Sequence, residues 1–350
     1  MKIKAIGMIS GGLDSTLAAY LLQRLGIDIQ GVNFSTGFCL TEHQRIIANY
    51  SPIGSKRRDR NLRNEALRAG SDLRFPIEII DISTDYLPIV THPKYGYGSA
   101  MNPCIDCRIF MLGKAMNYMR EVGAQFVFTG EVLGQRPMTQ HRRTLDLISK
   151  NSGLGDFLLR PLSAKLLPPT LPEKEGWIRR DDLLDIQGRS RKRQMELADE
   201  WGVEDYPQPA GGCCFLTDRN YARRVRDLID HRALSDLRHE DFLILKLGRH
   251  MRISPNTKII IGRDQGENEY IERYLTSYPQ MKPMTLPGPT TMILGSPSDD
   301  DIAKVTAIAA LYTAPQTTIP VEFYLQGLDS GDMKVSAMPA DPERIESYRL

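Results

Sequence analysis

Ser10-Gly11-Gly12-Leu13-Asp14-Ser15 is the stretch that decides the fold of this 350-residue chain. The apolar run Ile3–Ile9 before it is typical of a buried strand, and Thr16–Leu25 after it has the pattern of a helix. A strand, a tight glycine turn and a helix N-terminus together bind anions, because the first backbone N–H groups of a helix have no partner within the helix. The stretch therefore predicts a phosphate-binding loop.

Each residue of the loop suits that role in its own way. Gly11 and Gly12 let the backbone approach an anion closely and adopt φ values that other residues resist. Ser10 and Ser15 add hydroxyl donors. Asp14 would repel a bare phosphate, so we expect it either to hold a Mg²⁺ ion or to cap the helix.

The first two hundred residues alternate between strand and helix patterns. Strands are predicted at Lys4–Ile9, Ile27–Phe34, Phe75–Ile82 and Gln125–Thr129, and helices at Thr16–Leu25, Arg60–Ala69 and Ile109–Val122. This alternation predicts an α/β fold with a doubly wound parallel sheet, which binds ligands at the carboxyl ends of its strands. We therefore expect Ser10–Ser15, Asn33–Gly37 and Thr129–Gly130 to lie on one edge.

The rest of the chain predicts a second, smaller α+β domain. The breaks Leu167–Pro172 and Tyr206–Gly212 are rich in proline or glycine, and the composition shifts after the second. Between the two breaks, still in the first domain, a helix is expected at Arg179–Trp201. After the second break, helices are expected at Asn220–His231 and Asp299–Leu311, and strands at Phe242–Leu247 and Lys258–Ile261. We place the first domain at 1–217 and the C-terminal domain at 218–350.

The bulk properties fit an ordinary cytoplasmic protein. No apolar run reaches the ~18 residues of a membrane span, and the first strand begins too early to leave room for a signal peptide. The formal net charge of +2 does not by itself indicate a nucleic-acid partner. The basic patches Arg189–Arg193 and Arg223–Arg226 fit either RNA contacts or solvated helix faces.

The five cysteines indicate metal or redox chemistry. An odd number in a cytoplasmic chain is not a disulfide framework. Cys104 and Cys107 form a C-x-x-C pair, and two thiolates are too few for a stable metal site, so Cys213 or Cys214 should complete it. Cys39 is expected to be an inert buried cysteine. Further ligands without supporting spacing are His43, His92 and His141.

Three kinds of site fit this set of cysteines. Three cysteines on a 4Fe–4S cluster would leave one iron open to hold a sulfide as a nucleophile. The same residues suit a persulfide or disulfide relay, or a structural zinc ion. Ligand spacing alone does not separate these alternatives.

A third feature is the polar loop Thr129–Gln140, which begins at the end of a predicted strand. Its glycines, its glutamines and Arg136 suit the binding of a base, a ribose or a phosphate. Polar loops are common, so this loop alone does not indicate a binding site. The interpretation depends on its expected position beside Ser10–Ser15 on one edge of the sheet.

The loop Ser10–Ser15 resembles the SGGxDS loop of the PP-loop ATP pyrophosphatases. It is not a Walker A loop, because G-x-x-x-x-G-K-[ST] and its lysine are missing. The resemblance implies an enzyme that binds pyrophosphate here, cleaves ATP between the α- and β-phosphates and adenylates its substrate.

Four further segments resemble the tRNA thiouridine synthetases of that family. Thr129–Gln135 followed by Gln140 is similar to the TGExLGQ…SQ segment of 4-thiouridine synthetases, and Leu159–Leu162 to the arginine–proline–leucine that follows it. Asn102–Cys107 is similar to the NPxxxC segment of bacterial 2-thiouridylases, and Cys214–Tyr221 to their CFxxxRNF pattern. Those enzymes have Asp in place of Cys104, and a cysteine there matches the branch that uses a cluster.

The resemblance implies ATP-dependent thiolation of a tRNA uridine, with ATP, Mg²⁺ and a 4Fe–4S cluster as cofactors. It implies tRNA and a sulfur donor, either free sulfide or a carrier protein, as partners. The catalytic residues it implies are Cys107, Cys214 and Asp14. The implied ATP site is Ser10, Gly11, Gly12, Asp14, Ser15, Asn33 and Gly130. The implied cluster ligands are Cys104, Cys107 and Cys214, with Cys213 as the alternative third. Arg136 and Gln140 would position the substrate.

The C-terminal domain resembles the RNA-binding module of NFACT-type proteins over Leu247–Ile253, Lys258–Asp264 and Glu267–Asn268. The basic residues Arg249, His250, Arg252 and Arg263 fit RNA binding, although such a module could also only pack on the catalytic domain. Two other functions stay open at this point. One is a PP-loop enzyme that amidates, or forms a nitrile on, a small nucleotide-like substrate. The other is a non-catalytic RNA-binding protein.

Overall fold

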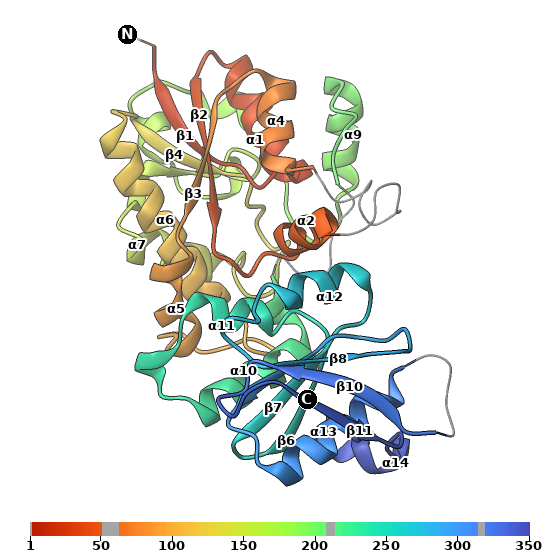
Figure 1. Ribbon diagram of the computed structural model, residues 1–350. Helices are drawn as coiled ribbons and strands as arrows, with labels where there is room; N and C mark the ends of the chain where they lie inside the picture. The colour runs from red at the N-terminus through yellow and green to blue at the C-terminus, as the bar shows by residue number, and fades with distance from the viewer. Residues whose placement is uncertain (1, 51–62, 208–213, 314–318) are drawn as a thin grey trace. The chain divides into compact units, whose positions relative to one another are not determined.

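A computed structural model describes residues 2–50, 63–207, 214–313 and 319–350. The chain divides into two compact units, which we call unit 1 (1–37 and 63–213) and unit 2 (38–62 and 214–350). Each unit has its own sheet and its own core (Figure 1). No helix among the described residues is long and apolar enough to cross a membrane. The domain boundary at 217/218 stays a prediction, because compactness does not show which segments fold independently.

Unit 1 is built on a five-stranded parallel sheet with the order β3-β2-β1-β4-β5. Its strands are β1 (Lys4–Met8), β2 (Asp28–Ser35), β3 (Ile77–Asp81), β4 (Phe126–Thr129) and β5 (Leu158–Leu159). The strand order reverses direction between β1 and β4. In a doubly wound sheet this is the switch point, where a crevice opens at the carboxyl ends of the strands.

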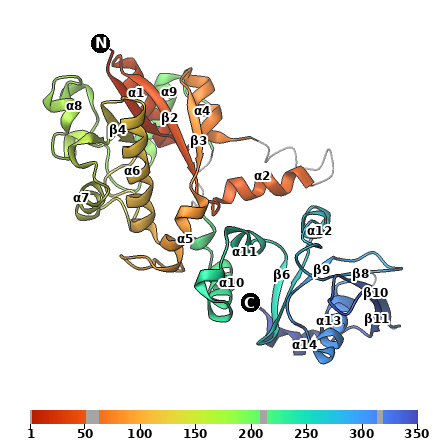
Figure 2. The same ribbon diagram turned by 60° about the vertical axis from the view of Figure 1, so that its left-hand side comes forward.

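Helices cover both faces of this sheet (Figure 2). On one face, α1 (Leu13–Arg24), α4 (Glu65–Leu73) and α9 (Lys192–Trp201) share a core with Ala5 and Phe126. On the other, α6 (Cys104–Glu121) and α7 (Arg142–Asn151) share one with Ile6 and Val127. Neighbouring residues of a strand point to opposite faces, and this explains the near-continuous apolar runs of the sequence. The remaining helices of unit 1 are α5 (Ser83–Thr91) and the short α8 (Leu171–Lys174).

Unit 2 is built on a six-stranded antiparallel sheet with the order β11-β10-β8-β9-β7-β6. Its strands are β6 (Arg249–Ser254), β7 (Thr257–Ile261), β8 (Gln280–Pro283), β9 (Thr291–Gly295), β10 (Val321–Gln326) and β11 (Met333–Ala337). Its described helices are α2 (Leu40–Tyr50), α10 (Arg219–His231), α11 (His239–Ile244), α12 (Gln265–Glu272), α13 (Asp299–Leu311) and α14 (Pro342–Ile345). Helix α13 buries Val305 and Ile308 against Phe323 and Ile293 of the sheet.

The predicted α/β class with a smaller α+β part is confirmed, but three predicted elements are wrong in whole or part. Phe242–Leu247 is not a strand: it overlaps α11, whose N-terminus is fixed by Asp241 accepting the backbone N–H of Arg238 at 2.8 Å. Only Lys192–Trp201 of the long helix predicted at Arg179–Trp201 forms. Helix α6 begins five residues before the predicted Ile109. Part of the helix predicted at Arg60–Ala69 lies outside the described residues.

Candidate functional site

The glycine loop lies at the switch point of the unit 1 sheet. It leaves the carboxyl end of β1 and enters α1, whose N-cap is Gly12. Among the residues that the structure describes, no side chain caps this helix, so its first N–H groups are available to an anion. Asp14 is the second residue of the helix and does not cap it, which excludes the capping alternative. The structure thus gives the predicted loop the geometry of an anion cradle.

Hydroxyl groups hold the loop in this shape. The Ser15 hydroxyl donates to the Gly12 carbonyl at 2.9 Å, and the Thr16 hydroxyl donates to the same oxygen at 3.1 Å. The Ser10 and Ser15 Oγ atoms lie 3.2 Å apart. Because both serines already contact the loop itself, the turn is preorganised before any ligand binds.

Gly11 is the residue of the loop that no side chain can replace without strain. Its φ is +78°, and a Cβ atom there would lie 2.2 Å from the backbone carbon of Glu65 at the start of α4. Gly12 differs, because its φ of −77° is ordinary and the nearest atom to a Cβ would be Ser10 Oγ at 3.5 Å. The close approach of α4 to the loop thus depends on Gly11.

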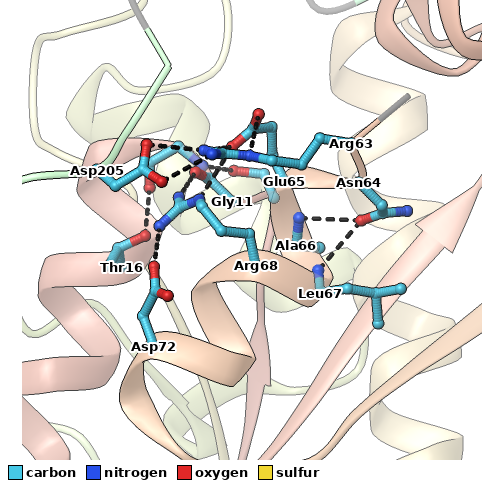
Figure 3. A network of polar contacts seen from close by, with 12 residues as sticks. Gly11, Thr16, Arg63, Asn64, Glu65, Ala66, Leu67, Arg68, Asp72 and Asp205 are labelled. Atoms are coloured by element: carbon cyan, nitrogen blue, oxygen red, sulfur yellow. Dashed lines mark hydrogen bonds and ion pairs between the residues drawn. The ribbon is translucent and has the colours of Figure 1, made fainter. Parts of the chain in front are cut away.

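Arg68 of α4 holds this helix close to the glycine loop (Figure 3). Its side chain is 7% exposed, and one nitrogen donates to the Gly11 carbonyl at 2.8 Å. The other nitrogens pair with Glu65 at 3.0 Å and Asp72 at 2.7 Å, both on the same helix. Arg63 lies further out, where it pairs with Glu65 and, through two bonds, with Asp205. Arg68 is therefore a positioning residue of the loop.

The two carboxylate oxygens of Asp14 differ in their hydrogen bonding. Oδ2 accepts the Gln135 amide at 2.8 Å and lies 4.0 Å from Arg191 of the predicted basic patch. Oδ1 is buried and has no hydrogen-bond partner among the described residues. Buried carboxylate oxygens normally have partners, and a carboxylate oxygen is the ligand that Mg²⁺ prefers. The carboxylate at the mouth of the loop therefore fits a Mg²⁺ ion.

Gly130 and Asn33, the other two expected ATP-binding residues, both contact the loop region itself. A Cβ on Gly130 would lie 2.5 Å from the backbone nitrogen of Ser15, so β4 can end beside α1 only with glycine there. The Asn33 side chain donates to the Ile9 carbonyl at 2.7 Å and ties the end of β2 to the end of β1. Their direct contact with ATP stays a prediction.

A buried ion cluster joins the two motifs that resemble 4-thiouridine synthetases. Arg160 lies 2.9 Å from Glu131, and Arg108, which follows Cys107 on α6, lies 3.2 Å from it. Burial would raise the pKa of Glu131, but Arg160 and Arg108 outweigh burial, and the pKa lies below its usual value. Glu131 is therefore an ionised anchor that fixes the start of the loop 130–140.

Gln140 closes this loop and Arg136 projects from it. The Gln140 side-chain oxygen accepts the Arg136 backbone N–H at 3.0 Å, and its carbonyl accepts the Gly134 N–H at 2.7 Å. Gln140 is buried, whereas Arg136 is exposed. Of the two predicted substrate-positioning residues, Arg136 is the one whose side chain is accessible, and the role of both stays a prediction.

Cys104 and Cys107 lie on the first turn of α6, one turn apart on the same helix face. The expected C-x-x-C turn is thus a helix N-terminus, where the helix dipole favours an anionic sulfur. The Asn102 amide donates to Cys104 Sγ at 3.1 Å, and the Asp106 carboxylate accepts the Lys94 and Tyr95 N–H groups. These contacts hold the start of α6 to the chain before it.

Cys214 belongs to unit 2, and Cys213 lies outside the described residues. No group of three or more His, Cys, Asp or Glu side chains able to hold a metal ion occurs within the described part of the chain. The third cluster ligand therefore stays a prediction.

Comparisons with known proteins show what the two parts of the chain resemble. Residues 3–151 match the family model of the tRNA methyl transferase HUP domain, and residues 248–349 match that of the NFACT protein RNA binding domain. The predicted resemblance to PP-loop thiouridine synthetases is confirmed. The tRNA-specific 2-thiouridylase MnmA of Lachnoclostridium phytofermentans is 24% identical over 261 residues, which cover 72% of this chain and 67% of that protein.

The matches to these thiouridine synthetases differ in extent. The MnmA of Syntrophotalea carbinolica is 29% identical over 126 residues, which cover 35% of this chain and 32% of that protein. Among solved structures, a 4-thiouridine synthetase–RNA complex with bound ATP aligns with 68% of this chain and 53% of its own, at 20% identity and a TM-score of 0.36.

Sequence reasoning on this thiouridine synthetase-like chain did not find Arg68, Gln135 as the partner of Asp14, or the pairing of Glu131 with Arg160. Glu131 and Arg160 each stood in a quoted motif, and two buried opposite charges in one domain are a usable signal. Arg68 gave no such signal, because its contact with Gly11 spans 57 residues of sequence.

Proposed function

We propose that this chain thiolates a tRNA uridine at the expense of ATP. The uridine carbonyl oxygen attacks the α-phosphorus of ATP, and pyrophosphate leaves. A sulfur nucleophile then adds to the activated ring carbon, and the carbon–oxygen bond breaks with AMP as the leaving group. The products are a thiouridine, AMP and pyrophosphate.

The observation that carries this proposal is a chain of contacts in unit 1 that links the cysteines to the glycine loop. Asn102 donates both to Cys104 Sγ and, at 3.3 Å, to Met138 Sδ in the loop 130–140. From the same loop, Gln135 donates to Asp14. One short loop therefore contacts both the nucleotide cradle and the neighbourhood of the thiols, as coupled adenylation and sulfur transfer require.

The residues of the cradle divide the work on ATP. The N–H groups at the start of α1 would bind the pyrophosphate part, and Ser10 and Ser15 would keep the turn in shape. Asp14 would hold Mg²⁺ through Oδ1, while Gln135 keeps Oδ2 in place. A bound Mg²⁺ neutralises the phosphate charge that builds up as pyrophosphate leaves.

The sulfur nucleophile would be handled by Cys104 and Cys107, with Cys214 as the third thiol. The helix N-terminus favours anionic sulfur at the first two positions. A cluster and a persulfide both use such thiols, and the described residues bring only two of them together in one unit. Iron and labile-sulfide content of protein purified without oxygen separates the two forms.

Unit 2 would bind the tRNA, as its match to an RNA-binding family model suggests. His250 does not take part in the way its charge suggested, because it is 2% exposed and its Nε2 faces the Leu247 carbonyl at 2.7 Å. Arg252 is held by Asp227. A free-sulfide or carrier-protein donor, a cytoplasmic location and a separate RNA-binding domain at 218–350 complete the proposal.

An assay of pyrophosphate release tests the proposal. It is run under anaerobic conditions with ATP, Mg²⁺ and unmodified tRNA. We expect release that depends on tRNA, and Asp14→Asn should lower it by about 100-fold because the metal-binding charge is lost. Asp28→Asn is the matched control, since Asp28 is half exposed and, among the described residues, forms an ion pair only with Lys2. Release that depends on ammonia instead of tRNA, or no release at all, would contradict the proposal.

A further inference from the structure

Cys39 stands directly opposite Cys214 in unit 2. The two residues form an isolated antiparallel bridge, in which the chain entering α2 runs beside the chain entering α10. Their separation in sequence is 175 positions, so nothing local predicted this pairing. The expectation that Cys39 is an inert buried cysteine does not account for it, because both cysteines are only partly buried.

The hydrogen bond beside the bridge fixes how the two side chains lie. The Phe215 N–H donates to the Phe38 carbonyl at 2.9 Å, so the bond joins the residue after Cys214 to the residue before Cys39. This pattern makes the cysteines a non-hydrogen-bonded pair, in which the Cα atoms of opposed residues lie about 4.5 Å apart and both side chains point to the same face. Disulfides span Cα distances of about 4.4–6.8 Å.

Aromatic packing keeps the two backbone segments in this register. Phe38 is fully buried and packs edge-on against Phe242, with ring centroids 5.5 Å apart. Phe215 packs against Tyr221 at 5.3 Å. The buried Lys246 ammonium lies 5.8 Å from the Phe38 ring and 5.3 Å from the Phe215 ring, so one side chain contacts both residues that flank the bridge. The two backbone segments that carry the cysteines are therefore held in register by packed side chains.

We propose that Cys39 and Cys214 form a redox site that closes to an intramolecular disulfide. The co-reactant is a low-molecular-weight disulfide such as oxidised glutathione. One thiolate attacks it and releases one thiol, and the second cysteine then attacks the mixed disulfide and releases the other. Two cysteine thiols are oxidised, one external disulfide is reduced to two thiols, and the protons pass to those thiols.

The consequence rests on the proposed function. Cys214 is one of the thiols expected to handle sulfur, and a disulfide to Cys39 takes it out of that chemistry until a reductant reopens the bond. Intracellular disulfides are commonly transient and redox-sensing. Cys39 would thus make the enzyme reversibly responsive to the thiol–disulfide balance.

The test is disulfide mapping of the full chain, which does not depend on activity. Protein reduced and then treated with excess oxidised glutathione under nitrogen is alkylated, digested with trypsin and analysed by mass spectrometry. The cysteines fall in separate peptides, 25–45 with Cys39, 95–108 with Cys104 and Cys107, and 194–219 with Cys213 and Cys214. We expect peptide 25–45 linked to 194–219, and the same link in Cys213→Ser. Alkylated Cys39, or a link from 194–219 to 95–108 in its place, would overturn the proposal.

A second experiment tests whether the disulfide controls thiolation. Oxidation should lower thiolation by wild-type protein at least tenfold, and dithiothreitol should restore it. Cys39→Ser should keep most of its thiolation through the same treatment. Equal loss in Cys39→Ser would overturn the proposal that the Cys39–Cys214 disulfide switches thiolation off. Absence of thiolation in every sample would instead refute the proposed function and leave the disulfide map readable.

Discussion

The glycine loop of unit 1 and the β6–β7 hairpin of unit 2 both carry residues that suggest ligand binding, but their groups are used differently. At the start of α1 the backbone N–H groups are uncapped, and Asp14 keeps one oxygen without a partner among the described residues. In the hairpin, Arg252 and Lys258 are bound to Asp227 at 2.8 Å each, and His250 is buried. The loop therefore keeps polar groups available for a ligand among the described residues, whereas the named basic groups of the hairpin are already engaged or buried within unit 2.

The largest expected effect concerns Cys107 of unit 1, which lies outside the glycine loop. Cys107→Ala should reduce thiolation by more than about 10³-fold, because a group that carries the nucleophile cannot be replaced by its surroundings. ATP binding should be unchanged, since Cys107 is not part of the cradle. Quantified thiouridine and ATP titration calorimetry on the same preparation measure the two. Thiolation at the wild-type rate would remove Cys107 from the mechanism.

The next prediction compares the two glycines of the loop. Gly11→Ala should cost about 1–3 kcal/mol of unfolding free energy through its positive φ, and it should abolish ATP binding because the Cβ displaces α4 from the loop. Gly12→Ala is the matched control and should fold like wild type. Urea denaturation and ATP titration distinguish them, and equal behaviour of the two variants would show that the loop does not hold the described conformation.

Arg68 offers a smaller effect at the same place. Arg68→Lys keeps the charge but loses the fork that reaches Gly11, Glu65 and Asp72 together. We expect KM for ATP to rise about tenfold, equivalent to about 1.4 kcal/mol, with little change in kcat. Arg63→Lys should stay within about twofold of wild type, because among the described residues Arg63 bonds to Glu65 and Asp205 and not to the loop. A matching rise in Arg63→Lys would contradict the positioning role.

The smallest effect concerns the hairpin of unit 2. Burial lowers the pKa of Lys258 to about 8, although Asp227 opposes this change. The unfolded chain then binds more protons than the folded one between about pH 8 and the ordinary lysine pKa of about 10.4, so stability should rise with pH across that window. Lys258→Met should flatten the rise, as thermal unfolding at pH 7, 8, 9 and 10 would show. An unchanged slope would mean that Lys258 is not buried as described.

Much of unit 1 could be predicted because its signals are local. The run Lys4–Ile9 and the loop after it specify a strand, a turn and a helix within 25 residues, and β1 and α1 form there. The secondary structure of Phe242–Leu247 is harder to predict, because a short apolar run fits a strand or a buried helix equally. The hydrogen bond from the Arg238 N–H to Asp241 stabilises the N-terminus of the helix. The contacts of Arg68, of Glu131 with Arg160 and of Cys39 with Cys214 join distant segments and follow only from the fold.

The most direct test of the central claim is mass spectrometry of the tRNA nucleosides from the source organism with and without this gene. The account predicts that one thiolated uridine disappears in the deletion strain. Wild-type protein should restore it, whereas Cys107→Ala and Asp14→Asn should not. An unchanged set of thiolated uridines in the deletion strain would contradict the assignment of this chain to tRNA thiolation.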